Sequence, residues 1–146
     1  MKNFLLRLAV FTALLAMLLP VFGASCLPPV DTGGDIVIIV GEQRFELENV
    51  EHEFIGQVLD ELAATEELVF SYNANPLLGR EVLSLGSLSA GYRTFVAIYI
   101  SILEPRWSNT FSSREADGVG FYSANYGIDG LPVLDGVIYL FALGSW

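Results

Sequence analysis

The feature that most constrains the fold is a change of apolar period along residues 35–70. "DIVIIV", residues 35–40, is a continuous run of mostly β-branched residues, which is typical of a buried strand. After a turn at "GEQ", the segment "RFELENV" alternates Phe45 and Leu47 with charged residues and predicts a half-buried strand with an acidic outer face. Apolar residues then recur every four positions, as in a helix. This order predicts a helix packed on a small sheet.

The predicted helix lies in "EFIGQVLDELAATEELVF", residues 53–70. Two neighbouring rows of apolar residues form one stripe, three to four turns long, that is typical of a core-facing helix. We expect this stripe to pack against a sheet that contains Phe45, Leu47 and Phe70. Gly56 lies inside the helix and weakens it by about 1 kcal/mol relative to alanine. The first row of the stripe is Phe54, Val58 and Leu62, and the second is Ile55, Leu59 and Ala63.

The segment "LVFSYNANPLLGREVLSL", residues 68–85, has strand character at both ends and turn-forming residues between them. Asn75 favours turn conformations, and Pro76 restricts the backbone on both of its sides. The distance between the two apolar runs is long for a tight hairpin. The segment therefore predicts a crossover loop between two strands, with Leu77 and Leu78 as a small apolar plug.

The sequence of residues 86–104 is compatible with either a helix or a strand. Tyr92, Phe95 and Tyr99 fit helical spacing, whereas "FVAIYISI" is rich in residues that favour strands. Pro105 is well placed to end a helix, and we therefore expect a second helix here.

The segments "GVGFYSANY" and "GVIYLFAL" predict strands within residues 105–146, with an irregular tail as the alternative. The fold class expected from all these segments is α+β, a small mixed sheet with two helices arranged as β-α-β repeats.

The N-terminus predicts export. Lys2 and Arg7 precede the apolar run "LAVFTALLAMLL", and "FGAS" supplies small residues for cleavage, so residues 1–25 are interpreted as a signal peptide. The apolar run is shorter than the roughly 20 residues of a membrane span. "GASC" resembles the bacterial lipobox, which predicts that Cys26 carries lipid; the alternative is an ordinary signal peptide that ends near Cys26. Residues 26–34 are interpreted as a tether rich in proline and glycine.

Charge and motif content disfavour several classes of function. After removal of residues 1–25, five arginines face 17 acidic residues, a net charge of −12. Such a protein repels phosphate backbones, and we expect no nucleic-acid partner. No pairing of a nucleophile with a base is recognisable, and no cofactor, metal site or catalytic residue is predicted.

Two sets of residues have both a functional and a structural interpretation. His52, the only histidine, is flanked by Glu51 and Glu53 and is interpreted as a solvent-facing residue at a helix start rather than a base or metal ligand. The aromatic residues Phe121, Tyr122 and Tyr126 can form an exposed patch for glycan or protein. Aromatic residues in such a strand are expected to pack inward instead.

The span "FELENVEHEFIGQVLDELAATEELVFSYNANPLLGREVLSL", residues 45–85, resembles the short N-terminal (STN) domain shared by secretins and TonB-dependent receptors. The similarity lies in a strand, a helix carrying "VLDEL", the sequence "FSYN", a turn with proline and glycine, and a second strand. Exported proteins of Bacteroidetes contain the most similar version. The resemblance implies two interleaved β-α-β halves within residues 35–104, and a periplasmic interaction module rather than an enzyme.

The resemblance also implies a place and a partner. We expect a protein of a Gram-negative periplasm or outer membrane, bound to an anti-sigma regulator or an outer-membrane protein in signalling or uptake, with a lipid anchor as a possible membrane contact. The alternatives are a structural envelope lipoprotein that binds glycan or a barrel protein, and a small secreted enzyme. A sheet edge or the helix face beside it is the expected binding surface. The acidic pairs Glu46/Glu48 and Glu66/Glu67 favour a basic partner segment.

Overall fold

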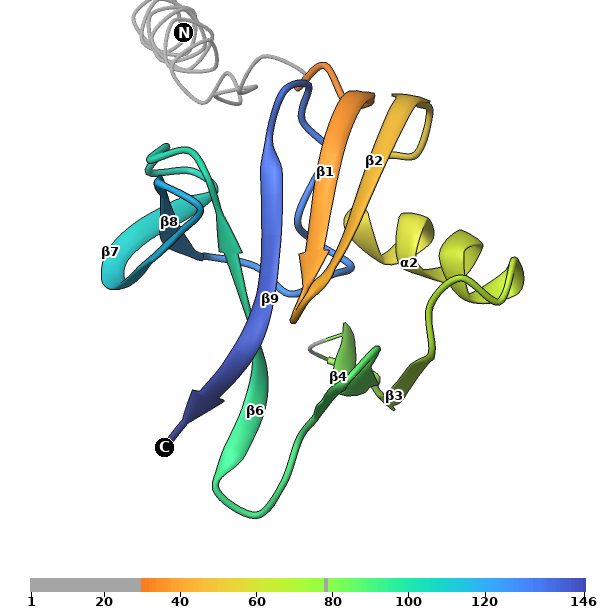
Figure 1. Ribbon diagram of the computed structural model, residues 1–146, viewed down its shortest axis with the longest axis vertical. Coiled ribbons are helices and arrows are strands. Elements are labelled where there is room, and N and C mark those ends of the chain that lie inside the picture. Colours follow the sequence, from red (N-terminus) through yellow and green to blue (C-terminus); the bar gives the residue numbers. More distant parts are fainter. Residues whose placement is uncertain (1–29, 78) are drawn as a thin grey trace, which may run out of the picture. The chain divides into compact units, whose positions relative to one another are not determined.

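The computed structural model describes residues 30–77 and 79–146, and the fold is that of the unit Asp31–Trp146 (Figure 1). The predicted signal peptide, Cys26 and residues 27–29 of the predicted tether lie outside the described residues, as does Leu78. Among the described helices, none has the length and apolar character needed to cross a bilayer.

One helix and nine strands make up the described secondary structure. The helix, α2, spans Ile55–Ala64. The strands are β1 (Gly34–Val40), β2 (Gln43–Val50), β3 (Phe70–Asn75), β4 (Gly79–Leu85), β5 (Leu88–Ser89), β6 (Thr94–Ile100), β7 (Ser108–Ala116), β8 (Val119–Ala124) and β9 (Ile138–Ser145).

The strands form two sheets. The larger has six strands in the order β2-β1-β9-β6-β8-β7, and the smaller has the order β3-β4-β5. β1 pairs with β9 in parallel and with β2 antiparallel, so the large sheet is mixed, as predicted. The predicted β-α-β repeat is wrong, because α2 connects β2 to a strand of the other sheet. The parallel neighbour of β1 is instead the last strand of the chain.

The predicted second helix is also wrong, since its central residues form strand β6. Val96, Ile98 and Ile100 pack into one core cluster, whereas Ala97 and Tyr99 pack into another on the opposite face of the sheet. A strand that is covered on both faces is apolar at nearly every position, which obscures its period of two. The segment continues beyond β6 through a bend, and Pro105 lies in the following turn.

The predicted crossover loop at residues 72–80 is a hairpin. β3 and β4 pair antiparallel from Phe70↔Leu85 to Asn75↔Gly79. The Asn75 side chain accepts a hydrogen bond from the Leu77 amide at 2.9 Å, and Gly79 adopts a φ of +81°, so the chain reverses within a short turn. Leu77 is 92% exposed and plugs nothing.

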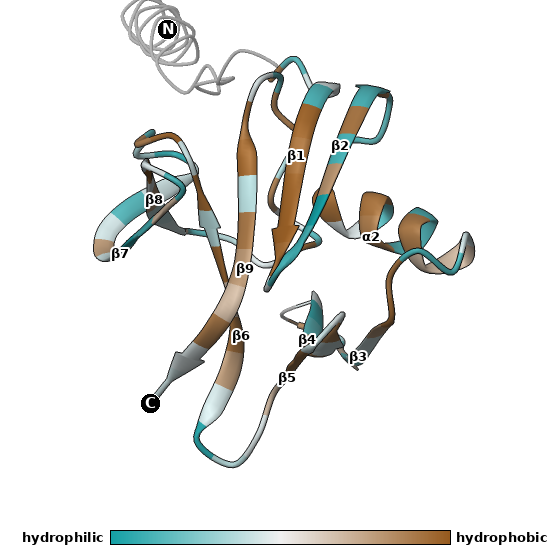
Figure 2. Ribbon diagram, viewed as in Figure 1, coloured by the Kyte–Doolittle hydropathy of each residue, from teal (hydrophilic) through white to brown (hydrophobic). Residues whose placement is uncertain are grey.

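The first core cluster lies between the large sheet, α2, the small sheet and the loop that precedes β9. Of the two predicted rows, the four middle members are buried, with Ile55 and Leu59 most completely enclosed, whereas Phe54 and Ala63 are half-buried. Phe45 and Phe70 pack against this cluster as predicted, but they belong to different sheets. Figure 2 shows the result, with β1 almost uniformly hydrophobic and β2 alternating in character.

The loop between β8 and β9 is held to the core by Tyr139. Its hydroxyl donates to the Pro132 carbonyl and accepts from the Leu134 amide, both at 2.8 Å. Burial raises the pKa of this phenol above its ordinary value. Residues 105–146, for which strands and an irregular tail were open alternatives, thus contribute three strands and a fixed loop.

Candidate functional site: a groove between an edge strand and a helix

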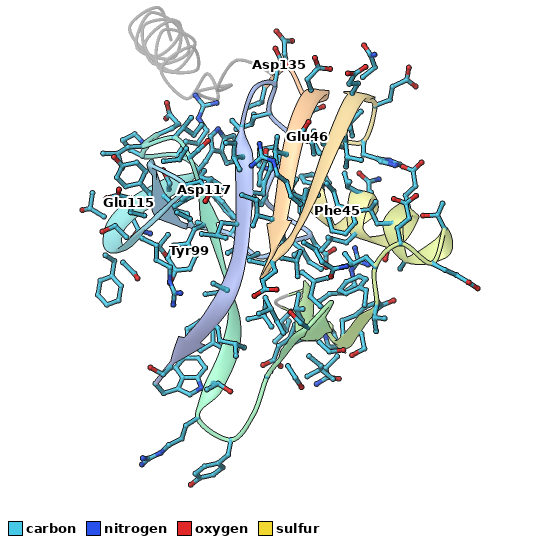
Figure 3. All side chains as sticks on the ribbon, viewed as in Figure 1. Phe45, Glu46, Tyr99, Glu115, Asp117 and Asp135 are labelled. Carbon is cyan, nitrogen blue, oxygen red and sulfur yellow. The ribbon has the colours of Figure 1, made fainter. Side chains whose placement is uncertain are left out.

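A groove of about 810 Å³ runs between β2 and α2. β2 is an outer strand of the large sheet, so one wall of the groove is a sheet edge. In Figure 3, Phe45 lies on the side of β2 that is nearer α2 and Glu46 on the other side. The lining residues are Glu46, Leu47, Glu48, Asn49, Val50, Glu51, His52, Gln57, Val58, Asp60, Glu61, Leu62, Thr65 and Glu67.

The floor of the groove is apolar. Val58 and Leu62 of α2 are almost fully buried, and Leu47 and Val50 of β2 are half-buried. The period of two along β2 turns Leu47 inward, and the spacing of four along α2 brings Val58 and Leu62 to the same side of the helix. The carboxylates that lie on the rim come from the positions next to these residues, Glu46 and Glu48 on β2 and Asp60 and Glu61 on α2.

The rim is strongly acidic and only partly neutralised. Six of the lining residues are Asp or Glu, and His52 is the one lining residue with a basic side chain. Within the part of the chain that the structure describes, Glu48, Glu51 and Glu67 take part in no ion pair. These three carboxylates are exposed and give the groove a negative potential.

The other three carboxylates of the rim have partners. Glu46 accepts from Arg44 at 2.9 Å, and Glu61 is hydrogen-bonded to His52 Nε2 at 2.8 Å. Both acidic side chains remain about two-thirds exposed or more. Asp60 is bound by an arginine from the β3–β4 hairpin, Arg80.

His52 is not simply solvent-facing as predicted. Its side chain is about 35% exposed and links the segment after β2 to Glu61 on α2, at one end of the groove. No group of three or more His, Cys, Asp or Glu side chains suited to a metal ion occurs among residues 30–77 and 79–146. His52 is one of the groove's lining residues.

The start of α2 is fixed by tertiary contacts instead of a capping Ser or Thr. The Gln57 side chain accepts hydrogen bonds from the Glu53 and Phe54 amides at 3.0 and 2.9 Å. The Ile55 amide donates to the Leu131 carbonyl, and the next amide donates to another carbonyl of the same loop. These bonds satisfy helix amides that would otherwise be unpaired and hold this wall of the groove to the loop before β9.

Arg80 fastens α2 to the β3–β4 hairpin and to the loop before β9. Its Nη1 donates to both carboxylate oxygens of Asp60 at 2.6 and 2.8 Å, and its Nε donates to Asp129 at 2.8 Å. The guanidinium also lies over the Tyr72 ring, 4.9 Å from the centroid. One side chain thus joins the helix, the hairpin and the loop before β9.

Arg80, Asp60 and Asp129 form a clamp on α2, and their opposite charges stabilise one another. Hydrogen bonds to Asp129 are the largest cause that raises the pKa of Arg80, and burial opposes them. Burial alone would raise the pKa of Asp129, but the hydrogen bonds and charge of Arg80 hold it below its ordinary value. Both groups are therefore charged at neutral pH, and the guanidinium is only 17% exposed.

Gly56 makes room for the clamp. A Cβ at this position would lie 2.8 Å from Asp129 Oδ1 and 3.2 Å from the Ile128 carbonyl oxygen, and it would overlap the Arg80 guanidinium. The helix therefore requires glycine where sequence analysis recognised only a weak position. That glycine was the one signal for a clamp whose members Arg80 and Asp129 are 49 residues apart.

The structure separates the acidic and aromatic sets that the sequence singled out. Glu46, Glu48 and Glu67 lie on the rim of the groove, whereas Glu66 is not among its lining residues. Phe121 is 1% exposed and packs in the second core cluster, which confirms inward packing for that residue. Tyr122 is partly buried, and the Tyr126 ring packs at a tilt against Trp107 with ring centroids 5.7 Å apart. The three aromatic residues do not form one exposed patch.

Comparison with known proteins gives a structural match. No protein-family model and no curated protein matches the chain. A crystal structure from Ruminococcus gnavus ATCC 29149, described as "a putative metal binding protein", is 16% identical in sequence and has a TM-score of 0.50. The match covers 80% of this chain and 99% of that chain. At this level of identity it shows a shared fold.

Proposed function

We propose that this protein is an exported, non-catalytic interaction module that binds a basic segment of a partner protein in the groove between β2 and α2. The observation that carries the proposal is an apolar floor bordered by unpaired carboxylates at the edge of a sheet. The floor offers burial to apolar side chains, and the rim attracts and orients positive charge.

The groove selects by charge at two levels. The exported chain has a net charge of −12, which favours encounter with a basic partner and repels an acidic one. At the rim, Glu48, Glu51 and Glu67 are available for Lys or Arg side chains. Each exposed ion pair is worth only about 0.2–1 kcal/mol, so we assign most of the affinity to the floor and most of the salt dependence to the rim.

The sequence resemblance of residues 45–85 to STN domains favours the same class of function, although the β-α-β arrangement that it implies is not found. The resembling span, residues 45–85, contributes β2 and α2, which line the groove, and the hairpin that carries Arg80. The partners that we propose are therefore an anti-sigma regulator or an outer-membrane protein. The location that goes with them is the periplasm or the outer membrane, with a lipid at Cys26 as the anchor.

A second candidate is a structural envelope lipoprotein that binds glycan. It is favoured by two aromatic side chains near the end of the β6–β9 pair, Tyr92 and Trp146, which are 97% and 85% exposed. The Trp146 ring packs on Phe95 with centroids 4.5 Å apart, which leaves its outer face for a sugar ring. A glycan titration followed by tryptophan fluorescence, with Trp146→Ala as the control, tests this candidate.

Capture of partners by the exported chain tests the first candidate. We expect a partner to be retained from a periplasmic extract at low salt and released at high salt. The double variant Glu48→Lys/Glu51→Lys should lose it, because the rim then repels a basic segment. The matched control is Glu115→Lys/Asp117→Lys, which makes the same charge change on the exposed β7–β8 hairpin (Figure 3). Equal capture by both variants, or hydrolysis of glycan or peptide by the pure protein, would contradict the proposal.

A further inference from the structure

We propose that the partner segment adds to β2 as a seventh strand of the large sheet, with apolar and basic side chains in alternation. This inference rests on the proposed function and adds the binding mode and the sequence pattern of the partner. It follows from a comparison of the two edges of the sheet, from the period of a strand, and from what lies on each side of β2.

The edge at β2 is regular. Its pairing with β1 runs without a shift through five consecutive residues, from Gln43 to Leu47. Among the described residues, the backbone of this stretch bonds only to β1. An edge strand directs alternate amides and carbonyls away from its neighbour, and these groups are a template for another strand.

The opposite edge is blunted. The pairing of β7 with β8 shifts between Asn109 and Ser113, and the intervening residues leave the ladder. Phe111 lies in this bulge with 96% exposure, and its amide is bonded to the Asn109 side chain at 2.8 Å. Bulges protect sheet edges against the addition of a strand. Strand addition requires a regular edge, so β2 can accept another strand, whereas the bulge protects β7.

The limits of the regular stretch set the length of the added strand. At one end Asn49 adopts a φ of +53°, and its amide is bonded to the Asp35 side chain at 2.9 Å. At the other end the chain turns at Gly41. About five residues of the partner can therefore pair with β2 in register.

The two sides of β2 set the pattern of the partner. Side chains of an added strand that face α2 meet the apolar floor at Leu47, Val58 and Leu62. Side chains on the opposite side meet Glu46 and Glu48, since residues at alternate positions of β2 share a face. A partner segment with apolar and basic residues in alternation satisfies both sides. A helical partner has a period of 3.6 and leaves the backbone of β2 unpaired.

Synthetic peptides test the binding mode with the full exported chain. The first peptide has about nine residues of alternating valine and lysine, and the second has the same composition with the lysines in one block. We expect the alternating peptide to bind at least about tenfold more tightly in calorimetry. Two further peptides are N-methylated at the even or at the odd positions. Strand addition requires one set of amides, so one of the two should lose at least about tenfold in affinity while the other binds as before.

The outcomes separate this inference from the proposed function. Equal affinity of the alternating and blocked peptides, or of the two methylated peptides, overturns strand addition. In that case the proposed function still stands if binding weakens with salt and is lost in Glu48→Lys/Glu51→Lys but not in Glu115→Lys/Asp117→Lys. Failure of every basic peptide to bind overturns both. A tenfold difference in both comparisons, with binding lost only in the groove variant, supports both.

Discussion

Gly56→Ala is expected to destabilise the protein, although glycine-to-alanine changes inside helices normally stabilise by about 1 kcal/mol. The added Cβ would lie 2.8 Å from Asp129 Oδ1 and would overlap the Arg80 guanidinium. Arg80 then has to withdraw from the pocket in which it binds Asp129. Hydrogen bonds to charged groups contribute about 1.5–3 kcal/mol each. The ion pair is partly exposed, so we count one such bond fully and discount the rest.

The balance of these effects gives a net loss of about 0.5–2 kcal/mol in the free energy of unfolding. Urea unfolding followed by tryptophan fluorescence measures it, and Gly127→Ala is the matched control. Gly127 has no atom within 4 Å of its Cβ position, and its φ is one that alanine adopts, so its variant should be neutral or slightly more stable. A Gly56→Ala protein more stable than the parent would refute the argument that Arg80 requires this glycine.

Three further predictions concern the core, the clamp and the N-terminus. Leu62→Ala should cost about 2–5 kcal/mol in urea unfolding, because Leu62 is 4% exposed, whereas Leu77→Ala at a fully exposed turn should change stability by less than about 0.5 kcal/mol. The pKa of Asp129 is lowered in the folded state, so the unfolded state binds more protons as the pH falls. The contribution of Asp129 to the free energy of unfolding is therefore present above its unfolded pKa of about 3.9 and is lost at lower pH. Acid unfolding of Asp129→Asn should therefore show a weaker pH dependence below about pH 5 than the parent. Cys26→Ser should move the exported protein from the membrane fraction to the soluble fraction, and an unmodified N-terminus beyond residue 26 in mass spectrometry would rule out lipidation.

The elements that sequence analysis predicted are those whose period is local. β2 and α2 each bury residues at a regular spacing, and β1 is a continuous β-branched run, so all three are visible without any tertiary information. β6 is covered on both faces like β1, and it was missed because Tyr92, Phe95 and Tyr99 also fit helical spacing. The start of α2 depends on carbonyls of the loop before β9, more than 70 residues away, and the parallel pairing of β1 with β9 joins the two ends of the fold.

The candidate site likewise has one part that local sequence predicts and another that depends on tertiary contacts. The acidic face of β2 at Glu46 and Glu48 follows from alternation along one strand, and it was predicted as part of a binding surface. The groove itself depends on where α2 lies, which the sequence does not reveal. Arg80 and Asp129, which hold that helix, are separated by 49 residues and share no local pattern. Only Gly56 marks their position in the sequence, and its meaning becomes clear in the fold.

Hydrogen exchange of the protein with and without a basic partner segment tests the central claim most directly. We predict slower exchange at residues 43–52 of β2 and its exit, and at residues 57–67 of α2 and its exit, with little change in β7 and β8. The protection should decrease as salt weakens binding. Protection confined to β7, or to the aromatic end of β6 and β9, would contradict the assignment of the groove as the binding site.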